Sequence, residues 1–429
     1  MLSRRPFFPF AISREKAIAH LSFKTAVFTG QKLITTWLRH LFPSLNVDAL
    51  RPIRAVPVYL PSWVIDAEVE ATAWVKKQES DDHFLKDAVQ VAFAHSDMPG
   101  FVYSPLSNLS FMTPMALNAD KLMAVPWSED LRRHDGHDVL CLPFSVTPFH
   151  VPDVVRSLSM ADANIANTLR FEPGSFKDTF LAAYPVLIPG YLAQYELDPD
   201  IHGHQPDMTI SSFIEAHIPD GRAVIEVLPS VKEFLRSFNF PAPDIFVNGP
   251  FAVFARSFAS VFKVTGKHIN NITHRPLIDR WVNRTMAQES SLRRYRDRFF
   301  GTSDAEAARK VESEWADLRI RPFDADERNA NLQWLGSGSD LFMLKTVLEV
   351  YNSMRDVSET DIEWTKSQIV DLEKTREERK PAWLAEYEIQ QRLLATPESS
   401  PSDNVIGQSD NTPNDSSSDA AAKPQEPSS

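Results

Sequence analysis

Metal-ligand side chains are densest in the segment His134-Asp-Gly-His137-Asp138. Imidazole and carboxylate groups are common zinc ligands, and two histidines three residues apart in a glycine-bearing turn can face one ion. A neighbouring aspartate can orient one of the rings through a hydrogen bond. The pattern predicts a metal site at His134, His137 and Asp138, with His202-Gly-His204 as the candidate source of a further ligand. A surface loop without metal is the alternative interpretation.

Three carboxylates, Asp66, Glu68 and Glu70, alternate with apolar residues in a segment that has strand periodicity. On one strand face, neighbouring carboxylates lie roughly 6.5 to 7 Å apart, which is two strand rises. That separation suits an inverting hydrolytic pair. Together with His134 and His137, these residues indicate a metal-assisted hydrolase as one function. A solvated strand face is the alternative.

Seven arginines between Arg275 and Arg298 stand against Asp279, Glu289 and Asp297, which gives a local charge of +4. The apolar spacing here predicts amphipathic helix, so the arginines can share a face. Such a face can contact RNA, anionic lipid or an acidic partner, including the C-terminal tail of the same chain. A solvated face paired with the acidic middle of the protein is the alternative. The proposed binding residues are Arg280, Arg284, Arg293, Arg294, Arg296 and Arg298.

Other signals for catalysis are weak. Gly336-Ser-Gly-Ser-Asp340 predicts a flexible turn before a helix starting at Leu341, whose N-terminal amides could hold a phosphate. The segment lacks the lysine and spacing of a P-loop, so a helix cap is the alternative. The lone cysteine, Cys141, excludes an intramolecular disulfide and a thiolate-rich zinc ribbon. We expect no cofactor.

The net charge of -12 is unevenly distributed along the 429 residues. Residues 1–47 carry seven basic side chains and one acid, and residues 396–429 carry six acids and one lysine. The tail is rich in Ser, Pro, Asn and Asp and has no aromatic residue, so we expect it to be disordered. The remaining middle of the chain is acidic, which argues against general binding of nucleic acid.

The basic, acid-poor N-terminus has helical periodicity, with Ile34, Trp37, Leu38 and Leu41 on one stripe. This combination is typical of a mitochondrial targeting segment. The alternative is the first helix of the folded domain, in a protein that is then cytoplasmic, and a short or uncleaved signal makes the two interpretations compatible. No apolar run reaches the length of a transmembrane helix. We therefore expect a soluble, intracellular protein.

Two regions read as antiparallel sheet. Strand alternation from Trp63 to Val75 is followed by a polar loop and a second alternating segment, Asp87 to Ala94, which predicts a hairpin. A second β region comprises Val186 to Leu197, Met208 to His217 and Arg222 to Leu228. Its last two strands are joined across a Pro-Asp-Gly turn, which favours a hairpin. Residues 153–167 have helical spacing.

The two β regions begin alike. Each has two prolines four residues apart and an aromatic residue two positions after the second proline. Prolines favour an extended approach without ladder hydrogen bonds, after which the aromatic side chain enters the sheet. We infer an internal duplication with a pseudo-twofold axis, and chance recurrence of prolines at strand starts is the alternative. The repeated residues are Pro57, Pro61, Trp63, Pro185, Pro189 and Tyr191.

Helical periodicity dominates after Pro250, and a last long helix is expected from Ser358 to Pro381. The chain therefore divides into four parts: a basic N-terminal helix and targeting segment (1–47), a duplicated β-rich domain (48–235, with units at about 55–150 and 183–235), a helical region (250–395) and a disordered acidic tail (396–429). The predicted fold class is α+β.

The first proline-bracketed segment, Pro57-x-Tyr59-Leu60-Pro61-x-Trp63, is preceded by Phe8 to Glu15 and followed by Tyr191-Leu-Ala-x-Tyr195. These residues resemble an uncharacterised β-rich module that lies beside a zinc ribbon in bacterial proteins and occurs in uncharacterised fungal chains. The resemblance covers roughly residues 8–230. Because this chain lacks a zinc ribbon, no metal is carried over. The resemblance implies no known activity and favours a binding or scaffold role.

These observations lead to three hypotheses for function. The first is a non-enzymatic, mitochondrial scaffold or assembly protein that binds other proteins or a membrane surface. The second is the metal-assisted hydrolase that uses His134 and His137. The third is a protein that contacts RNA or anionic lipid through the arginine-rich helix between Arg275 and Arg298.

Overall fold

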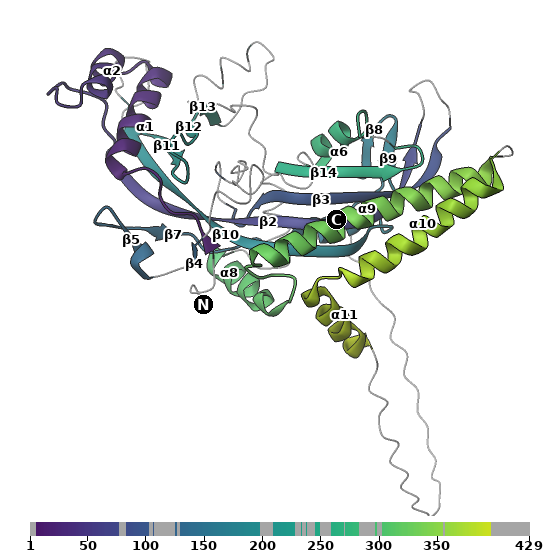
Figure 1. Ribbon diagram of the computed structural model, residues 1–429. Helices are drawn as coiled ribbons and strands as arrows, with labels where there is room; N and C mark the ends of the chain where they lie inside the picture. Colours follow the sequence, from purple (N-terminus) through teal and green to yellow (C-terminus); the bar gives the residue numbers. More distant parts are fainter. Residues whose placement is uncertain are drawn as a thin grey trace, which may run out of the picture. The chain divides into compact units, whose positions relative to one another are not determined.

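The computed structural model describes most residues between Pro6 and Ala395 (Figure 1). The chain divides into two units, Met1–Tyr387 and Glu388–Ser429. The tail predicted to be disordered, residues 396–429, lies outside the described residues. The residues described are 6–76, 83–102, 106, 125–126, 129–197, 209–227, 233, 237, 245–248, 259–269, 271–282, 297, 303–354 and 357–395.

One large sheet organises the first unit, and its strands follow the order β13-β12-β11-β10-β2-β3-β14 (Figure 1). Neighbouring strands along this path are antiparallel. The bounds are β2 Arg54–Val75, β3 Leu85–Pro99, β10 Lys177–Glu196, β11 Thr209–Glu215, β12 Ala223–Glu226, β13 Ile245–Asn248 and β14 Ala259–Gly266.

Shorter strands join the margins of this sheet or form a separate hairpin. They are β1 Pro6–Phe7, β4 Val125–Pro126, β5 Arg133–His134, β6 His137–Asp138, β7 Leu140–Cys141, β8 Asn164–Ala166 and β9 Leu169–Phe171. The helices are α1 Arg14–Thr29, α2 Leu33–Leu41, α3 His150–Arg156, α6 Arg275–Trp281, α8 Asp304–Ser313, α9 Ala325–Ser353, α10 Glu359–Glu378 and α11 Ala382–Ala395, with 3-10 turns at Glu129–Arg132 and Glu314–Ala316.

The predicted α+β class is confirmed. Helices α1 and α2 precede the sheet, and α8 to α11 follow it in the sequence. β2 and β3 form the hairpin that alternation predicted, and the Pro-Asp-Gly turn connects the antiparallel strands β11 and β12. Gly221 is required in that turn, because a Cβ atom there would lie 1.8 Å from the carbonyl oxygen of Glu215.

The two proline-bracketed segments lie side by side at the centre of the sheet. Aligning them on their prolines makes Ile188 the counterpart of Leu60, and these two residues are register partners in the β2–β10 ladder. β3 begins to pair at Ser62 and β11 begins to pair at Gly190, which is the counterpart of Ser62. A local twofold axis through the Leu60–Ile188 pair therefore relates the two hairpins, as expected for a duplicated unit.

The similarity of the two copies extends to the segments that precede the long strands. Pro-Phe-Ala-Ile-Ser at 9–13 and Pro-Phe-Ser-Val-Thr at 143–147 are similar in sequence. The strand β1, just before the first of these segments, pairs in parallel with β10, and β7, just before the second, pairs in parallel with β2. Each copy thus places its leading segment against the long strand of the other copy, so the two copies are interlocked.

The repeated aromatic residues explain part of this interlocking. Trp63 Nε1 donates a 2.7 Å hydrogen bond to the carbonyl of Val146, and the Tyr191 hydroxyl donates a 3.2 Å hydrogen bond to the carbonyl of Ile12. Both rings are fully buried, and a buried aromatic with a polar atom requires such a partner. Each copy therefore uses its aromatic residue to hold the leading segment of the other.

The prolines lie within the sheet, so the predicted extended approach without ladder hydrogen bonds is wrong. Pro57 and Pro61 are both register partners of β10 residues. The carbonyl of Pro61 points outward to the amide of Gly100 at 3.0 Å, and the carbonyl of Pro189 points to the amide of Ala216 at 2.9 Å. In an antiparallel strand, the N–H and C=O groups of one residue point to the same side. The side on which each proline lacks an N–H group is therefore the side away from the β2–β10 ladder, where one neighbouring strand ends and the next begins.

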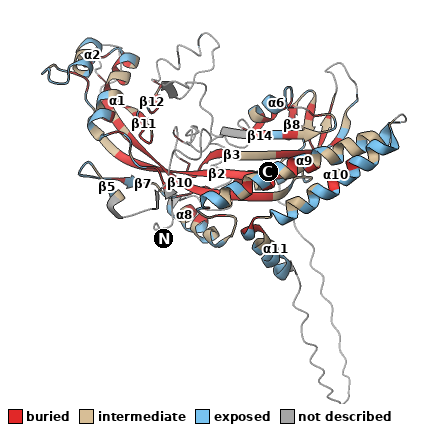
Figure 2. Ribbon diagram, viewed as in Figure 1, coloured by how far each residue is buried: buried red, intermediate tan, exposed pale blue. Residues whose placement is uncertain are grey.

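The sheet is covered on both faces, so its long strands are buried along most of their length (Figure 2). One face carries the core clusters that include Trp63 and Tyr191, with side chains from α1, α3, α6 and α8. The opposite face carries a cluster with Leu60 and Ile188, together with Trp334 of α9 and Trp383 of α11. This double coverage explains why both faces of β2 are buried, including its acidic face.

Three expectations about helices need correction. Residues 259–266, expected to be helical, form β14 and pair with β3. Residues 164–166, also expected to be helical, form β8, since the helix α3 ends at Arg156. The glycine-rich segment 336–340 is not a turn but lies inside α9, where a close approach to the sheet requires a small residue. None of the described helices combines the length and apolarity of a membrane span.

Candidate functional site

Helix α1 packs against the sheet. Ser13 caps its N-terminus by accepting a hydrogen bond from the amide of Lys16, and Gly30 ends it in the left-handed conformation that glycine adopts without strain. Ala17, Leu21 and Ala26 are buried against strands β10 to β12. The first half of the predicted targeting segment is therefore an integral part of the core.

Helix α2 is anchored to the segment that leads into β2. Lys32 forms a 2.8 Å ion pair with Asp48, and the hydroxyl of Thr35 donates to the carbonyl of Asp48 at 2.8 Å. The buried hydroxyl of Thr36 accepts a hydrogen bond from the amide of Leu50 at 2.9 Å. These polar contacts hold one face of α2 against the protein.

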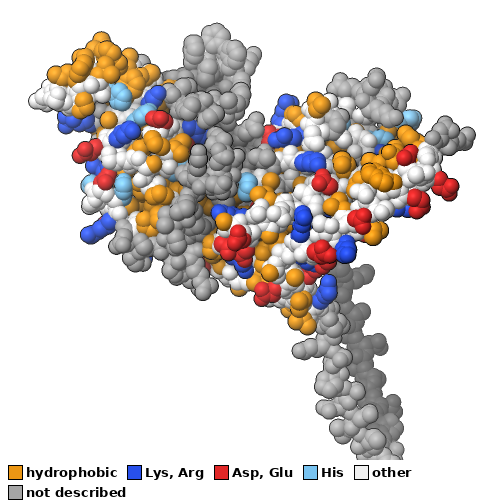
Figure 3. Space-filling model, in the orientation of Figure 1, with side chains coloured by type: hydrophobic (Ala, Val, Ile, Leu, Met, Phe, Trp, Pro, Cys, Tyr) orange, Lys and Arg blue, Asp and Glu red, His pale blue; other side chains and the backbone are white. Residues whose placement is uncertain are grey.

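The opposite face of α2 is apolar and exposed. The predicted helical stripe is present, but its side chains point to solvent: Ile34 is 73% exposed, Trp37 47% and Leu41 49%. Phe42, just beyond the helix, is 54% exposed. We call these four residues the α2 ridge. Figure 3 shows the hydrophobic side chains gathered over α2, with basic and histidine side chains next to them. A contiguous apolar surface of this kind typically marks an interaction site.

A basic hollow lies beneath α2. It is lined by α1, α2 and residues 49–55 and has a volume of about 720 Å³. Four arginines, Arg14, Arg39, Arg51 and Arg54, line it together with His40, and Glu15 is the acidic side chain of its lining. We call this feature the arginine pocket.

The arginines of this pocket form no ion pair at salt-bridge distance among the residues that the structure describes. No described ion pair or side-chain hydrogen bond involves the guanidinium of Arg39 or Arg54, and the buried Nε of Arg14 lacks a hydrogen-bond partner. The pKa of Asp48 is lowered mainly by Lys32 and to a smaller extent by the nearby charge of Arg51. The backbone amide of Arg14, in contrast, is bound at 2.7 Å by Asp135. The pocket therefore presents unpaired positive charge, which is suited to an anionic ligand.

The predicted metal residues lie in the β5–β6 hairpin. The His134 ring stacks on Phe10 at a centroid distance of 4.2 Å, and His134 and His137 are register partners. Asp138 is exposed and pairs with Arg133 at 3.3 Å. Within the described part of the chain, no three His, Cys, Asp or Glu side chains are grouped to hold a metal. A metal ligand role for His134, His137 and Asp138 stays a prediction, and His202 and His204 lie outside the described residues.

Most of the predicted arginine face lies outside the described residues. Arg280 is exposed on the short helix α6, whose buried residues Ile278 and Trp281 pack on the sheet. A binding role for Arg280 and its neighbours stays a prediction. Outside the described residues lie Arg284, Arg293, Arg294, Arg296 and Arg298.

The acidic face of β2 is buried, so the expectation of a solvated strand face is wrong. Asp66 is fully buried and accepts hydrogen bonds from the amide of His95, at 2.7 Å, and from the hydroxyl of Tyr184. Burial raises the pKa of Asp66 above its usual value. Tyr184 in turn accepts a 2.9 Å hydrogen bond from Asn331, which accepts one from Trp383. This chain of hydrogen bonds fastens α9 and α11 to the sheet.

Glu68 is also buried and forms an ion pair with Arg376 of α10 at 3.0 Å. Thr179 donates a further hydrogen bond to Glu68 at 2.7 Å. Glu70, two residues on, is only partly buried and lies opposite Lys177 in the ladder. The carboxylates therefore serve different structural contacts and do not converge on a shared space as a hydrolytic pair would.

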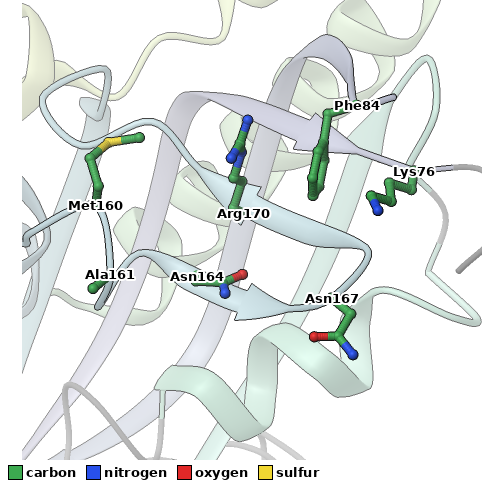
Figure 4. A pocket seen from close by; sticks show the side chains of 7 residues that line it. All are labelled: Lys76, Phe84, Met160, Ala161, Asn164, Asn167 and Arg170. Atoms are coloured by element: carbon green, nitrogen blue, oxygen red, sulfur yellow. The ribbon is translucent and has the colours of Figure 1, made fainter. Parts of the chain in front are cut away.

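A second hollow of about 490 Å³ lies at the edge of the sheet near the end of β2 (Figure 4). The Arg170 guanidinium lies 4.3 Å from the centre of the Phe84 ring, and Lys76 lies 5.0 Å from it. Asn164, Asn167 and Met160 complete the open rim in the figure. Because these cations already contact an aromatic ring in an open groove, the arginine pocket is the stronger candidate for ligand binding.

Sequence reasoning identified the apolar stripe of α2 but missed the arginine pocket. Its basic residues come from positions 14, 39, 51 and 54, which no local motif connects. The available signal was the excess of basic over acidic residues in 1–47. No protein-family model, curated protein or solved structure matches this chain.

Proposed function

We propose that this protein is a non-enzymatic scaffold that attaches to an anionic membrane surface through helix α2 and presents its interlocked β module to other proteins. The observation that carries the proposal is the α2 ridge: an amphipathic helix, anchored by its polar face, turns its apolar face to solvent beside basic side chains. Such helices bind in the plane of a membrane interface, with apolar burial and attraction to anionic lipid acting together.

Charge complementarity favours a membrane over an apolar protein groove as the occupant of the α2 ridge. Lys32, Arg39, Arg51 and Arg54 lie on or near α2, and Asp48 is already paired with Lys32. An anionic membrane surface attracts each basic residue near it by about 1 kcal/mol at physiological ionic strength. An apolar groove in a protein would gain little from these charges.

Vesicle binding by the full-length chain tests the proposal. We expect wild type to co-sediment with anionic vesicles, and Ile34→Glu/Trp37→Glu to lose at least about tenfold in affinity because charged groups would enter the interface. The matched control is Trp364→Glu/Val370→Glu, since those apolar residues of α10 are 62% and 63% exposed. Equal binding of wild type and the α2 ridge variant would contradict attachment through α2.

The cellular location of the protein is a separate part of the proposal. The basic, acid-poor segment 1–47 favours a mitochondrial location. Since α1 contributes buried residues to the core, we propose that the signal is retained after import. The full chain fused to a fluorescent reporter should co-localise with mitochondria and keep its N-terminal peptide in mass spectrometry. Diffuse fluorescence in the cytosol would contradict this location.

A further inference from the structure

The arginine pocket and the α2 ridge lie on opposite sides of the same short helix. Ile34, Trp37 and Leu41 form the exposed face, whereas Thr36, Arg39 and His40 line the pocket. A helix with its side chains is about 10 to 12 Å across. If the α2 ridge enters the acyl boundary of a membrane, the pocket is held one helix diameter away, at the depth of the lipid headgroups.

We infer that the arginine pocket binds a lipid headgroup that carries two phosphates. This inference rests on the proposed function, because the α2 ridge must bring the pocket to the membrane. Counting Arg14, Arg39, Arg51 and Arg54 against Glu15 gives the lining a charge of +3 with His40 neutral. A headgroup with two ionised phosphates and no ammonium group comes nearest to this excess. Zwitterionic headgroups carry no net charge, and phosphatidylserine, with one phosphate, one carboxylate and one ammonium group, carries a single negative charge.

The size and donor chemistry of the pocket agree with this ligand. Its volume of about 720 Å³ exceeds what one phosphate requires. Guanidinium groups bind phosphate oxygens through two parallel N–H donors, and they retain their charge at any physiological pH. The exposed Arg51 and Arg54 provide donors on the open side of the pocket.

Binding of the full-length protein to two kinds of vesicle tests the inference. One contains cardiolipin, which carries two phosphates per headgroup, and the other contains phosphatidylserine at the same total surface charge. We expect wild type to bind cardiolipin vesicles about tenfold more tightly, because additional charge-assisted hydrogen bonds form in the pocket. Arg51→Gln/Arg54→Gln should lose this preference, so that the loss of two positive charges weakens binding to both kinds of vesicle and leaves the two affinities equal.

Matched variants separate the pocket from nonspecific charge. Lys374→Gln/Arg379→Gln removes the same charge from exposed positions at the end of α10 and should keep the preference for cardiolipin.

Competition by soluble inorganic diphosphate distinguishes a lipid headgroup from a free ligand. Diphosphate should compete only weakly, because it lacks the membrane contact that the α2 ridge gives to a lipid. Circular dichroism of each variant confirms that it is folded.

The outcomes distinguish this inference from the proposed function. Equal binding to both kinds of vesicle, abolished by Ile34→Glu/Trp37→Glu, would overturn the headgroup preference and leave membrane attachment standing. Absence of vesicle binding would overturn both. Strong competition by diphosphate, or retention on RNA that depends on Arg51 and Arg54, would also overturn the lipid headgroup as the ligand of the pocket.

Discussion

Asp97 is a buried carboxyl group whose protonated form the fold favours. Ser62 Oγ donates a 2.5 Å hydrogen bond to one carboxyl oxygen, and the other has no hydrogen-bond partner among the described residues. Burial raises the pKa of Asp97 to about 7, opposed by the Ser62 hydrogen bond and by Arg222. An unfolded chain releases this proton near pH 4.

The stability of the protein should therefore depend on pH through Asp97. Between about pH 4 and pH 7 the folded state binds more protons at this group than the unfolded state, so its contribution to the free energy of unfolding falls as the pH rises. Asp97→Asn keeps the group neutral. We expect Asp97→Asn to be more stable than wild type at pH 8, on the order of a few kcal/mol, with a smaller difference at pH 5.

Urea unfolding at the two pH values measures this difference. Asp138→Asn, at an exposed position, serves as the control and should change the free energy of unfolding by less than about 0.5 kcal/mol at either pH. A stability difference between Asp97→Asn and wild type that does not grow with pH would rule out a protonated Asp97.

At the scale of elements, the contact between α9 and β2 depends on one glycine. A Cβ atom at Gly338 would lie 1.9 Å from Oε2 of Glu68 and 2.7 Å from Nη2 of Arg376. The ion pair between Glu68 and Arg376 thus occupies the space beside the helix backbone. Gly336, two residues before Gly338 in the same helix, would have no atom within 4 Å of an added Cβ.

These two glycines give a matched pair of alanine substitutions in one helix. Gly336→Ala should stabilise the protein by up to about 1 kcal/mol, because alanine has the higher helix propensity. Gly338→Ala should destabilise it by about 1 to 3 kcal/mol, because the helix or the ion pair must shift. Urea unfolding of both variants checks the prediction, and a stabilising Gly338→Ala would show that α9 does not approach β2 this closely.

The elements differ in how far the sequence predicts them. The alternation after Trp63 predicted β2 and its hairpin correctly, because both strands are adjacent in sequence and one period describes them. The burial of Asp66 and Glu68 was not predictable in this way, because their contacts come from distant parts of the chain. Asn331 reaches Asp66 through Tyr184, Arg376 pairs directly with Glu68, and both lie more than 250 positions away. Local periodicity reports which residues share a face but not what packs on that face.

At the scale of the whole molecule, the similarity of the two proline-bracketed segments was visible in the sequence, whereas the way in which they interlock was not. The paired prolines indicated two copies, and the register of Leu60 with Ile188 agrees with a local twofold axis. The exchange of leading segments between copies, visible in the hydrogen bonds of Trp63 and Tyr191, depends on how the chain crosses between them. The same holds for the arginine pocket, which forms only when α1, α2 and the start of β2 meet.

The depth of α2 in a membrane tests the central claim most directly. In a Cys141→Ser background, one environment-sensitive fluorophore is attached at Ile34→Cys, and in a second variant at Trp364→Cys on α10. With anionic vesicles, attachment through α2 predicts a blue-shifted, brighter emission at position 34 and unchanged emission at position 364. Unchanged emission at position 34, or the same shift at both positions, would contradict membrane attachment through the α2 ridge.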